Sequence, residues 1–370
     1  MASELMDSVR EFLFPGRFVR RAIAPLDSGL TPNDRLENLV GALDVEVEEP
    51  DDAVLLDDGS VLVSSRGQLL RSWQGTTSVF ATLPGEAGPV VLAPDGTVFV
   101  GVAGVGLCQV SQDGSATVVI TGDEDGPLHC VTDLALGPSG TLYLTNGSTE
   151  FSGDDWVRDL MAQNTSGRVV RVDLATGTGS VLARNLAYPA GITMVDEGRR
   201  LVVCEAWAHR IISIDVASSS VEVLRDNFPG YPGRINADRD GRLWLAVFAL
   251  RTQLVEFVLS QRDFVDEMTR TIDPDFWIRP ALRSLNSGLE PLQGGQIRKL
   301  GVVKPWAPPR SYGLVAILDA DANVVESWHS RGGGTRHGVT SVRTCGDQLV
   351  VVVRGAHQVV VSDKRDRDEH

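Results

Sequence analysis

The sequence lacks the features of a membrane-spanning or secreted chain. Its 370 residues contain no run of about 18 apolar residues, the length a transmembrane helix needs. The opening residues, MASELMDSVREFLFPG, carry acids at Glu4 and Asp7 and no long apolar core, so we do not expect a secretory signal. The four cysteines are scattered without a CxxC pair. This usage predicts reduced thiols in a cytoplasmic protein.

Basic residues are also scarce. There are 34 Lys and Arg against 49 Asp and Glu, a net charge of −15. Nucleic-acid binding needs a basic face to contact phosphates, so we expect no nucleic-acid partner. The HExxH, GxSxG and Rossmann motifs are absent, and the glycine-rich Gly332–Thr335 lacks the lysine of a phosphate-binding loop. The familiar metalloprotease, serine-hydrolase and nucleotide-binding classes are therefore not indicated.

The chain begins with a short amphipathic segment within residues 1–35. Apolar residues at helical spacing precede a stop at Pro15-Gly16; they are Leu5, Val9, Phe12 and Leu13. We expect this helix to pack on the domain or on a second subunit of a homo-oligomer. A membrane-surface helix is the alternative, because arginines lie in and just after it. The last residues, 364–370, are all polar and predict a frayed tail.

One pattern repeats along the rest of the chain. A short apolar run, a turn carrying glycine and a second run rich in Val and Leu recur in order, as in VVLAPDGTVFV and DLALGPSGTLYL. This is typical of a β-hairpin. The turn glycines are Gly59, Gly96, Gly140, Gly198, Gly241 and Gly346. Four of the units continue into a second hairpin, and a spacing of roughly 40–50 residues per four strands is that of a propeller blade.

These repeats predict an all-β fold, a six-bladed β-propeller with short helical insertions, over residues 36–363. The long intervals place insertions at about 148–166 and 253–311, the first with a helical stretch from Trp156 to Met161. Only half a blade remains after His337. Because propellers close by borrowing a strand from the other end of the chain, we expect residues near Leu36–Val47 to complete the last blade.

Residues at the start of each innermost strand should converge on one central pocket. The candidates are Asp51, Asp52, Gly88, Thr132, Asp133, Ala190, Gly233, Arg234 and the stretch from His337 to Thr340. His129 and His337 precede inner strands and titrate in the useful range, so they are candidate general bases.

Several segments resemble the strictosidine synthase-like family. They are YPAGITMVDEGRRLVVCEAWAHRIISIDV, NFPGYPGRINADRDGRLWLAV, EPDDAVLLDDGSVLVSS and DLALGPSGTLYLTN. The resemblance implies a six-bladed propeller related to the paraoxonases and gluconolactonases. It also implies small-molecule chemistry, since relatives include ester and lactone hydrolases and an enzyme that condenses an amine with an aldehyde. One scaffold thus hosts several chemistries.

The resemblance also implies a calcium site that this sequence only partly keeps. Acids remain at Asp51, Asp52 and Asp133, but Ala190, Thr132 and the pair Gly233-Arg234 stand where metal-dependent relatives have amide or carboxylate ligands. Calcium needs six to eight oxygens. We therefore expect either that Arg234 takes the place of the cation beside Asp51, or that it points outward. One structural calcium on Asp52 and Asp133 is a separate alternative to no cofactor at all.

Two further positions follow from the resemblance. The glutamate that condensing relatives use as acid/base corresponds to Thr340 or Ser341, neither of which transfers protons near neutral pH. The strictosidine-forming reaction is therefore not expected. Glu205 matches a recurrent family acid that either supports the pocket or pairs with His209 or Arg210.

The sequence thus predicts an enzyme for a small-molecule substrate, and ester or lactone hydrolysis is the choice that the resemblance favours. The alternatives are a metal-independent condensing enzyme, lyase or isomerase, and a non-catalytic binding or scaffold propeller. The predicted catalytic residues are His129, His337, Asp51 and Arg234. The predicted substrate-binding residues are Thr132, Asp133, Thr340 and Glu205.

Overall fold

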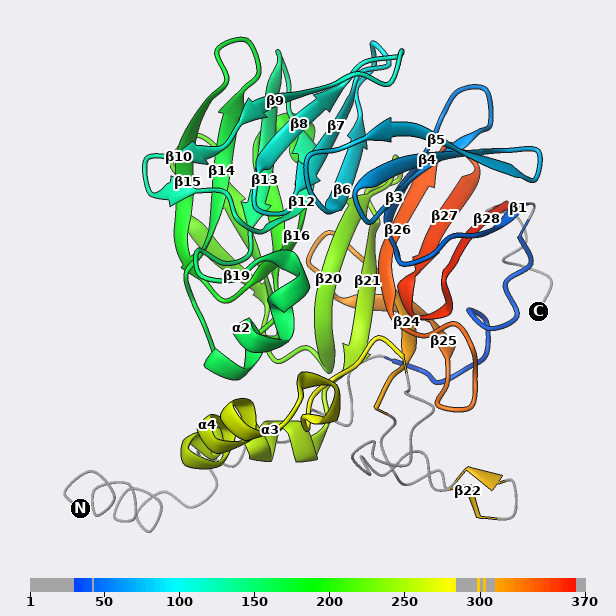
Figure 1. The fold of residues 1–370 in the computed structure, drawn as a ribbon, viewed down its shortest axis with the longest axis vertical. Coiled ribbons are helices and arrows are strands. Elements are labelled where there is room, and N and C mark those ends of the chain that lie inside the picture. Colours follow the sequence, from blue (N-terminus) through cyan, green and yellow to red (C-terminus); the bar gives the residue numbers. More distant parts are fainter. Residues whose placement is uncertain (1–29, 42, 284–297, 300–301, 304–309, 364–370) are drawn as a thin grey trace.

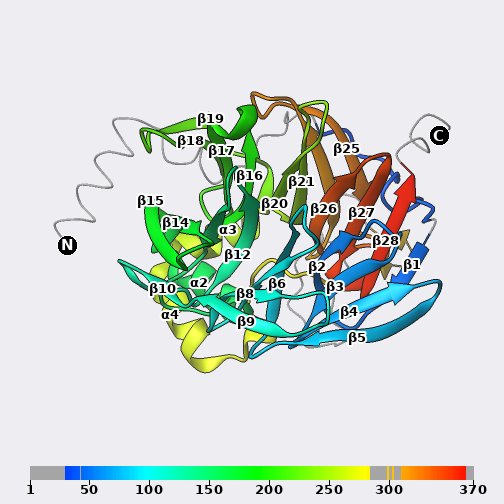
Figure 2. The same ribbon diagram turned by 90° about the horizontal axis from the view of Figure 1, so that it is seen from above.

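The strands form six four-stranded antiparallel sheets around one axis (Figures 1 and 2). The structure is a computed structural model that describes residues 30–41, 43–283, 298–299, 302–303 and 310–363. The innermost strand of each sheet packs against the innermost strand of the next, and the last packs against the first. The predicted six-bladed β-propeller is therefore confirmed.

The first three blades follow one another along the chain. Blade 1 contains β2 (Pro50–Leu55), β3 (Val61–Ser65), β4 (Gln68–Trp73) and β5 (Thr76–Thr82). Blade 2 contains β6 (Ala87–Leu92), β7 (Val98–Val102), β8 (Gly106–Val110) and β9 (Ala116–Ile120). Blade 3 contains β12 (Val131–Leu136), β13 (Thr141–Asn146), β14 (Gly167–Asp173) and β15 (Thr178–Leu186). A small hairpin, β10 (Gly122–Asp123) and β11 (Gly126–Pro127), joins blades 2 and 3.

The last three blades include one large insertion and the closure of the ring. Blade 4 contains β16 (Pro189–Val195), β17 (Arg200–Glu205), β18 (Arg210–Asp215) and β19 (Val221–Arg225). Blade 5 contains β20 (Gly230–Ala237), β21 (Leu243–Leu250), β24 (Gly313–Leu318) and β25 (Val324–Ser330). Blade 6 contains β26 (Val339–Cys345), β27 (Gln348–Val353), β28 (Gln358–Asp363) and β1 (Leu43–Glu46).

The repeated turn glycines make the inner hairpins possible. All six have a positive φ, from 59° at Gly346 to 90° at Gly198. This backbone conformation is unfavourable for any residue that has a side chain, so glycine is preferred there. The strands beside these turns bury Val, Leu and Ile between neighbouring sheets. One such layer joins Val54 and Leu62 of blade 1 to Val90 and Val100 of blade 2. The core therefore lies between the blades, and the axis itself is left for polar groups.

The ring closes as expected, because a strand from before blade 1 completes blade 6. β1 pairs antiparallel with β28, with Val45 opposite Val359. Both residues are buried in a layer shared with β2 and β3 of the first blade. The prediction that a strand near Leu36–Val47 completes the last blade is confirmed.

The helices gather on one side of the propeller (Figure 1). η2 (Gly153–Asp155) and α2 (Trp156–Ala162) lie between β13 and β14. α3 (Gln253–Ser260), α4 (Arg262–Thr271) and η4 (Pro274–Phe276) follow β21, and these helices share an apolar cluster with α2. The other short elements are η3 (Asp196–Gly198), η5 (Arg354–Ala356), β22 (Arg298–Lys299) and β23 (Val302–Val303). Within the described ranges, no helix is long and apolar enough to cross a bilayer.

Candidate active site

Each of the six innermost strands has an irregularity in its pairing near its start. The register shifts fall between Pro50 and Asp52 in blade 1 and at the matching place in every other inner strand. A bulge turns its extra residue out of the ladder and is common beside active sites. The residues at these shifts are Asp51, Gly88, Thr132, Ala190, Gly233, Arg234 and Thr340, and all of them line one cavity of about 950 Å³. The bulges therefore explain why the predicted positions converge.

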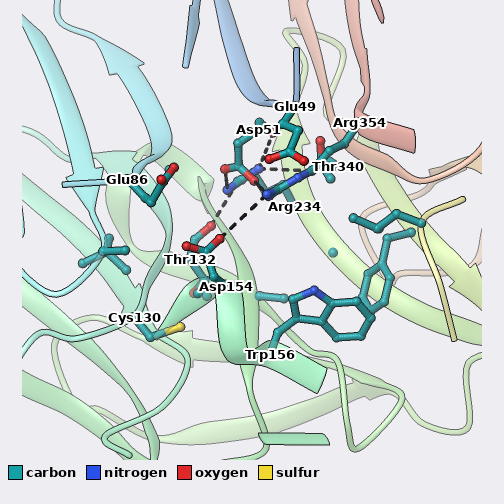
Figure 3. A pocket seen from close by; sticks show the side chains of 18 of the residues that line it. Glu49, Asp51, Glu86, Cys130, Thr132, Asp154, Trp156, Arg234, Thr340 and Arg354 are labelled. Carbon is teal, nitrogen blue, oxygen red and sulfur yellow. Dashed lines mark hydrogen bonds and ion pairs between the residues drawn. The ribbon is translucent and has the colours of Figure 1, made fainter. Parts of the chain in front are cut away.

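Arg234 is the centre of this cavity. Its Nε donates to the carbonyl of Thr132 at 3.0 Å, and its Nη1 donates to the carbonyl of Asp51 at 2.7 Å. Its Nη2 donates to Oδ2 of Asp51 at 2.5 Å (Figure 3). Burial lowers the pKa of Arg234, but the neighbouring carboxylates outweigh this and the net pKa is raised. Arg234 points inward and ties three blades together as a permanently charged group.

Asp51 is shared by two guanidinium groups. Its Oδ1 accepts from Nη1 of Arg354 at 2.9 Å, while its Oδ2 is held by Arg234. The second arginine also faces Asp154, with Nη2 3.8 Å from Oδ1. Partial desolvation and the nearby acids raise the pKa of Asp154 against the opposing effect of Arg354, while its side chain stays 56% exposed. The cavity thus places a proton-accepting group beside an arginine.

A second arginine, Arg343 in β26, pairs with the inner aspartates outside the lining of the cavity. Its Nη2 is 2.7 Å from Oδ2 of Asp52 and 3.6 Å from Oδ1 of Asp133. Burial raises the pKa of Asp52, but Arg343 and Arg234 outweigh it and the pKa lies below its ordinary value. For Asp133, burial prevails over the same two arginines and raises the pKa to about 7.

Asp52 and Asp133 also connect neighbouring blades. Asp52 accepts from the backbone N–H of Val90 at 2.8 Å, and Asp133 accepts from that of Ile192 at 2.9 Å. Each inner aspartate therefore joins its own blade to the next. These bonds, with Arg343, occupy the oxygens that a cation would need.

The residues present do not fit the predicted calcium site. Among the described residues, no three or more His, Cys, Asp or Glu side chains are grouped to hold a metal ion. Asp52 and Asp133 face a guanidinium instead, and Asp51 faces two. Calcium requires several more oxygens, free of competing cations. The expectation of a structural calcium on Asp52 and Asp133 is therefore not supported by their contacts.

One wall of the cavity is aromatic. Trp156, Tyr188, Trp207 and Phe248 line it, and the rings of Tyr188 and Trp207 stack with centroids 4.4 Å apart. The Trp156 ring, from α2 in the helical insertion, packs edge-on against that of Phe248, with ring centroids 5.4 Å apart. Trp207 is fixed by its Nε1–H, which donates to Oδ1 of the buried Asp159 at 2.6 Å. The cavity can therefore hold a ligand that is apolar on one side and polar on the other.

Two predicted binding residues lie at the cavity and differ in their bonding. Thr132 Oγ1 donates to the carbonyl of Pro189 at 2.5 Å and is occupied within the protein. Thr340 Oγ1 is buried and has no hydrogen-bond partner among the described residues. A buried hydroxyl without a partner is costly, so Thr340 is the better candidate to contact a ligand.

Three other predicted residues do not line the cavity. His129 is half-buried beside it but absent from its lining. His337 Nε2 contacts the Arg331 carbonyl and its Nδ1 contacts the hydroxyl of Ser311, both at 2.9 Å. Glu205 is fully buried, where it accepts from the backbone of Ala187 and from Arg210. Neither histidine is among the residues that line the central cavity, and Glu205 has the structural pairing with Arg210.

Sequence reasoning missed several groups that the fold brings to the site. They are Arg343, Arg354, Glu49, Glu86, Asp154 and the four aromatic residues. Arg343 left a signal, because an arginine inside an apolar inner strand requires a buried partner. The aromatic residues left none, since they come from blades 4 and 5 and from an insertion, with no common spacing.

Comparison with known proteins supports the resemblance drawn from the sequence. The strictosidine synthase family model matches residues 132–219. The STRICTOSIDINE SYNTHASE-LIKE 4 protein of Arabidopsis thaliana is 31% identical over 155 residues, which are 42% of each chain. The match thus spans about two fifths of that relative. The predicted resemblance to the strictosidine synthase-like family is confirmed over this part of the chain.

Solved structures share the fold across nearly the whole chain. The calcium-binding protein regucalcin from Agrobacterium tumefaciens aligns with a TM-score of 0.56 at 13% identity and covers 88% of this chain and 93% of its own. A protein assigned as a gluconolactonase aligns with a TM-score of 0.55 at 13% identity, and the alignment covers 89% of this chain and 95% of that protein. At this identity the likeness shows the six-bladed fold alone.

Proposed function

We propose that this strictosidine synthase-like propeller is an enzyme that hydrolyses an ester or lactone in its central cavity without a bound metal ion. The observation that carries the proposal is the guanidinium of Arg234, bonded on the axis to Asp51 and Thr132. The metal-dependent relatives implied by the sequence place calcium at these positions. A guanidinium cannot be deprotonated near neutral pH and supplies a fixed positive charge there.

The single negative charge of Asp51 does not neutralise both of the arginines that contact it. Arg234 and Arg354 share this one carboxylate, and Asp154 lies 3.8 Å from Arg354. The side chain of Arg354 is 28% exposed, against 10% for Arg234. Arg354 is therefore the cation that a ligand reaches, and Arg234 positions it through Asp51.

The proposed step uses Asp154 as the base. Water gives a proton to the Asp154 carboxylate while its oxygen adds to the substrate carbonyl carbon, and the electron pair moves to the carbonyl oxygen. Arg354 stabilises that oxyanion. Collapse of the tetrahedral species breaks the ester bond, and the departing alkoxide takes the proton back from Asp154. The raised pKa of Asp154, due to burial and neighbouring acids, makes it a stronger base than an ordinary aspartate.

Binding of the substrate would use the two different faces of the cavity. The aromatic wall receives the apolar part, and the unpartnered Thr340 hydroxyl contacts the polar part. The cytoplasmic location and the homo-oligomer remain predictions, and residues 1–29 lie outside the described part of the chain.

The test is a panel of lactones and aryl esters, assayed with and without a chelator, beside metal analysis of the purified protein. We expect turnover that the chelator leaves unchanged. Asp154→Asn should lower kcat about 100-fold or more. Glu222→Gln, an exposed acid in β19, should leave kcat unchanged and serves as the control.

Three results would each contradict the proposal. Tightly held stoichiometric calcium with chelator-sensitive turnover would restore the metal mechanism. Chelator-insensitive turnover that Asp154→Asn leaves intact would remove Asp154 as base. Ligand binding in the cavity without turnover of any substrate would favour a binding propeller.

A further inference from the structure

A second cavity adjoins the first on the side of the helical insertions. Its volume is about 1060 Å³, and it shares Glu49, Asp154, Trp156, Leu282 and Arg354 with the central cavity. Its other walls come from α2, from η4 with the residues after it, and from η5. A ligand in the central cavity can therefore extend into this outer cavity past Asp154 and Arg354.

The lining of the outer cavity is densely charged, with one more arginine than acid. Its lining contains the five arginines Arg158, Arg279, Arg283, Arg310 and Arg354, against the four acids Glu49, Asp154, Asp155 and Asp275. The whole chain has a net charge of −15, so this local excess of cations runs against the overall sign. Such a concentration of guanidinium groups is what recognition of carboxylate or phosphate uses.

Two of these arginines are held in place by indole rings. The guanidinium of Arg158 lies 5.4 Å from the centre of the Trp277 ring, and that of Arg279 lies 5.8 Å from the centre of the Trp156 ring. Arg279 also donates from Nε to the Pro274 carbonyl at 2.9 Å. Stacking fixes the plane of a guanidinium group and so reduces the entropy lost when it binds an anion.

Two neighbouring arginines are also crowded together. Burial and the charge of Arg310 lower the pKa of Arg279 to about 10. Oδ1 of Asp275, whose side chain is 64% exposed, lies 3.6 Å from Nη2 of Arg279. A bound anion would relieve the repulsion between the two cations.

We propose that the outer cavity binds an oxyanion group of the substrate, a carboxylate or a phosphate, while the reacting carbonyl lies in the central cavity. The identity of the ligand as substrate rests on the proposed function. The binding of an oxyanion at the arginine cluster does not, because it follows from the charges and stacking of the outer cavity alone.

The first experiment measures binding without turnover. Inorganic phosphate and acetate are titrated separately into the full-length protein by calorimetry, which distinguishes the two oxyanions. We expect at least one to bind, and Arg158→Gln to weaken that binding about tenfold or more, as for loss of one charged hydrogen bond. Arg158 is 46% exposed, so its replacement tests binding without disturbing a buried group.

The matched control is Arg184→Gln, which removes the same charge. Arg184 is 46% exposed and pairs with Glu124 and Asp125 on the blade 2–3 hairpin. The Arg184→Gln variant should bind the anion with an affinity within about twofold of wild type, because long-range surface charge is screened by salt. If neither anion binds the wild-type protein, or if Arg158→Gln and Arg184→Gln have equal effects, the inference is wrong.

The second experiment uses substrates in pairs. Each aryl ester or lactone that is turned over is compared with a derivative that carries a carboxylate or a phosphate at the far end from the carbonyl. We expect the anionic member to have the lower KM, and Arg158→Gln to remove that preference while kcat for the neutral member stays unchanged. Anion binding without turnover would leave the outer site standing and refute the proposed function. Turnover with no preference for the anionic member would leave the proposed function standing and refute the outer cavity as the site for an anionic group of the substrate.

Discussion

Arg343 in the last blade contacts Asp52 in the neighbouring first blade, with Nη2 2.7 Å from Oδ2. The Asp52 side chain is fully buried and that of Arg343 is 16% exposed. The ring of blades is thus closed twice, once by the backbone pairing of β1 with β28 and once by this ion pair. The second closure lies at the axis, where it also supports the charges of the cavity.

Replacing Arg343 by Met should be strongly destabilising. The change leaves Asp52 and Asp133 buried with one fewer compensating cation, and breaking a buried pair on one side costs about 3–5 kcal/mol. Urea unfolding of the variant beside Arg184→Met, a surface control, measures the difference. Equal midpoints for the two variants would show that Arg343 does not stabilise the axis.

Stability at acid pH should depend on Glu37. Burial raises its pKa, but bonds from Ser330, Thr335 and Arg336 outweigh this and lower the pKa from 4.5 to about 2. A depressed folded-state pKa gives stability that is present above about pH 4.5 and lost as the pH falls toward 2. Glu37→Gln should therefore unfold more easily at pH 7, by about 1–2 kcal/mol after allowance for its partial exposure. A melting series from pH 7 to 2 checks it: the gap from wild type should shrink with acid, and a constant gap would contradict the assignment.

The pH profile of turnover should carry an acidic limb from Asp154. The base must be ionised to accept a proton from water, so the rate falls as the pH drops below its pKa. That pKa is raised by burial and by neighbouring acids, so the limb lies at higher pH than for an ordinary aspartate. The residual rate of Asp154→Asn, followed over the same pH range, should lack the limb. A limb retained by the variant would assign it to another group.

Trp207→Phe should weaken substrate binding more than it slows the reaction. Phenylalanine keeps an apolar ring against Tyr188 but cannot donate to Asp159. The ring at position 207 then loses the hydrogen bond that fixes it in the aromatic wall. The buried Asp159 carboxylate still accepts a hydrogen bond from the side-chain amide of Asn164. We expect KM to rise several-fold with kcat within about twofold. A fall in kcat at unchanged KM would place Trp207 nearer to the chemistry than the structure does.

The closing strand offers a test with neighbouring residues. Val45 is 4% exposed and packs between blades 6 and 1, whereas Asp44 beside it on β1 is exposed. Val45→Ser should cost about 2–4 kcal/mol, through lost packing and a buried hydroxyl. Asp44→Ser should stay within about 0.5 kcal/mol of wild type. Equal unfolding midpoints would mean that β1 contributes little to the closed ring.

The fold could be predicted from the sequence because the information is local. Each hairpin carries its own glycine turn and alternating strands, as around Gly96 and Gly140, and repetition of one unit defines the propeller. The start of each inner strand then gives the axis positions, so Asp51 and Arg234 could be paired in advance. The same reasoning needed no knowledge of side-chain packing.

The rest of the site depends on contacts between distant residues. His129 and His337 stand just before inner strands but do not line the cavity, whereas Thr132 and Thr340 at the register shifts do. Arg354 lies in η5, after the second strand of blade 6, and Asp154 lies in an insertion with no counterpart in the repeat. Spacing along the chain carries no information on which insertions cover the axis.

Blade 6 is built from strands at both ends of the propeller, and this limits the order in which the blades can fold during synthesis. Its sheet combines residues 43–46 with residues 339–363, so it cannot form until nearly all of the described chain has emerged from the ribosome. Arg343 and Arg354 belong to the same blade. During synthesis the carboxylates of Asp51 and Asp52 therefore cannot form their ion pairs with these arginines until blade 6 has been made. The electrostatic centre of the protein is finished last, in the same event that shuts the ring.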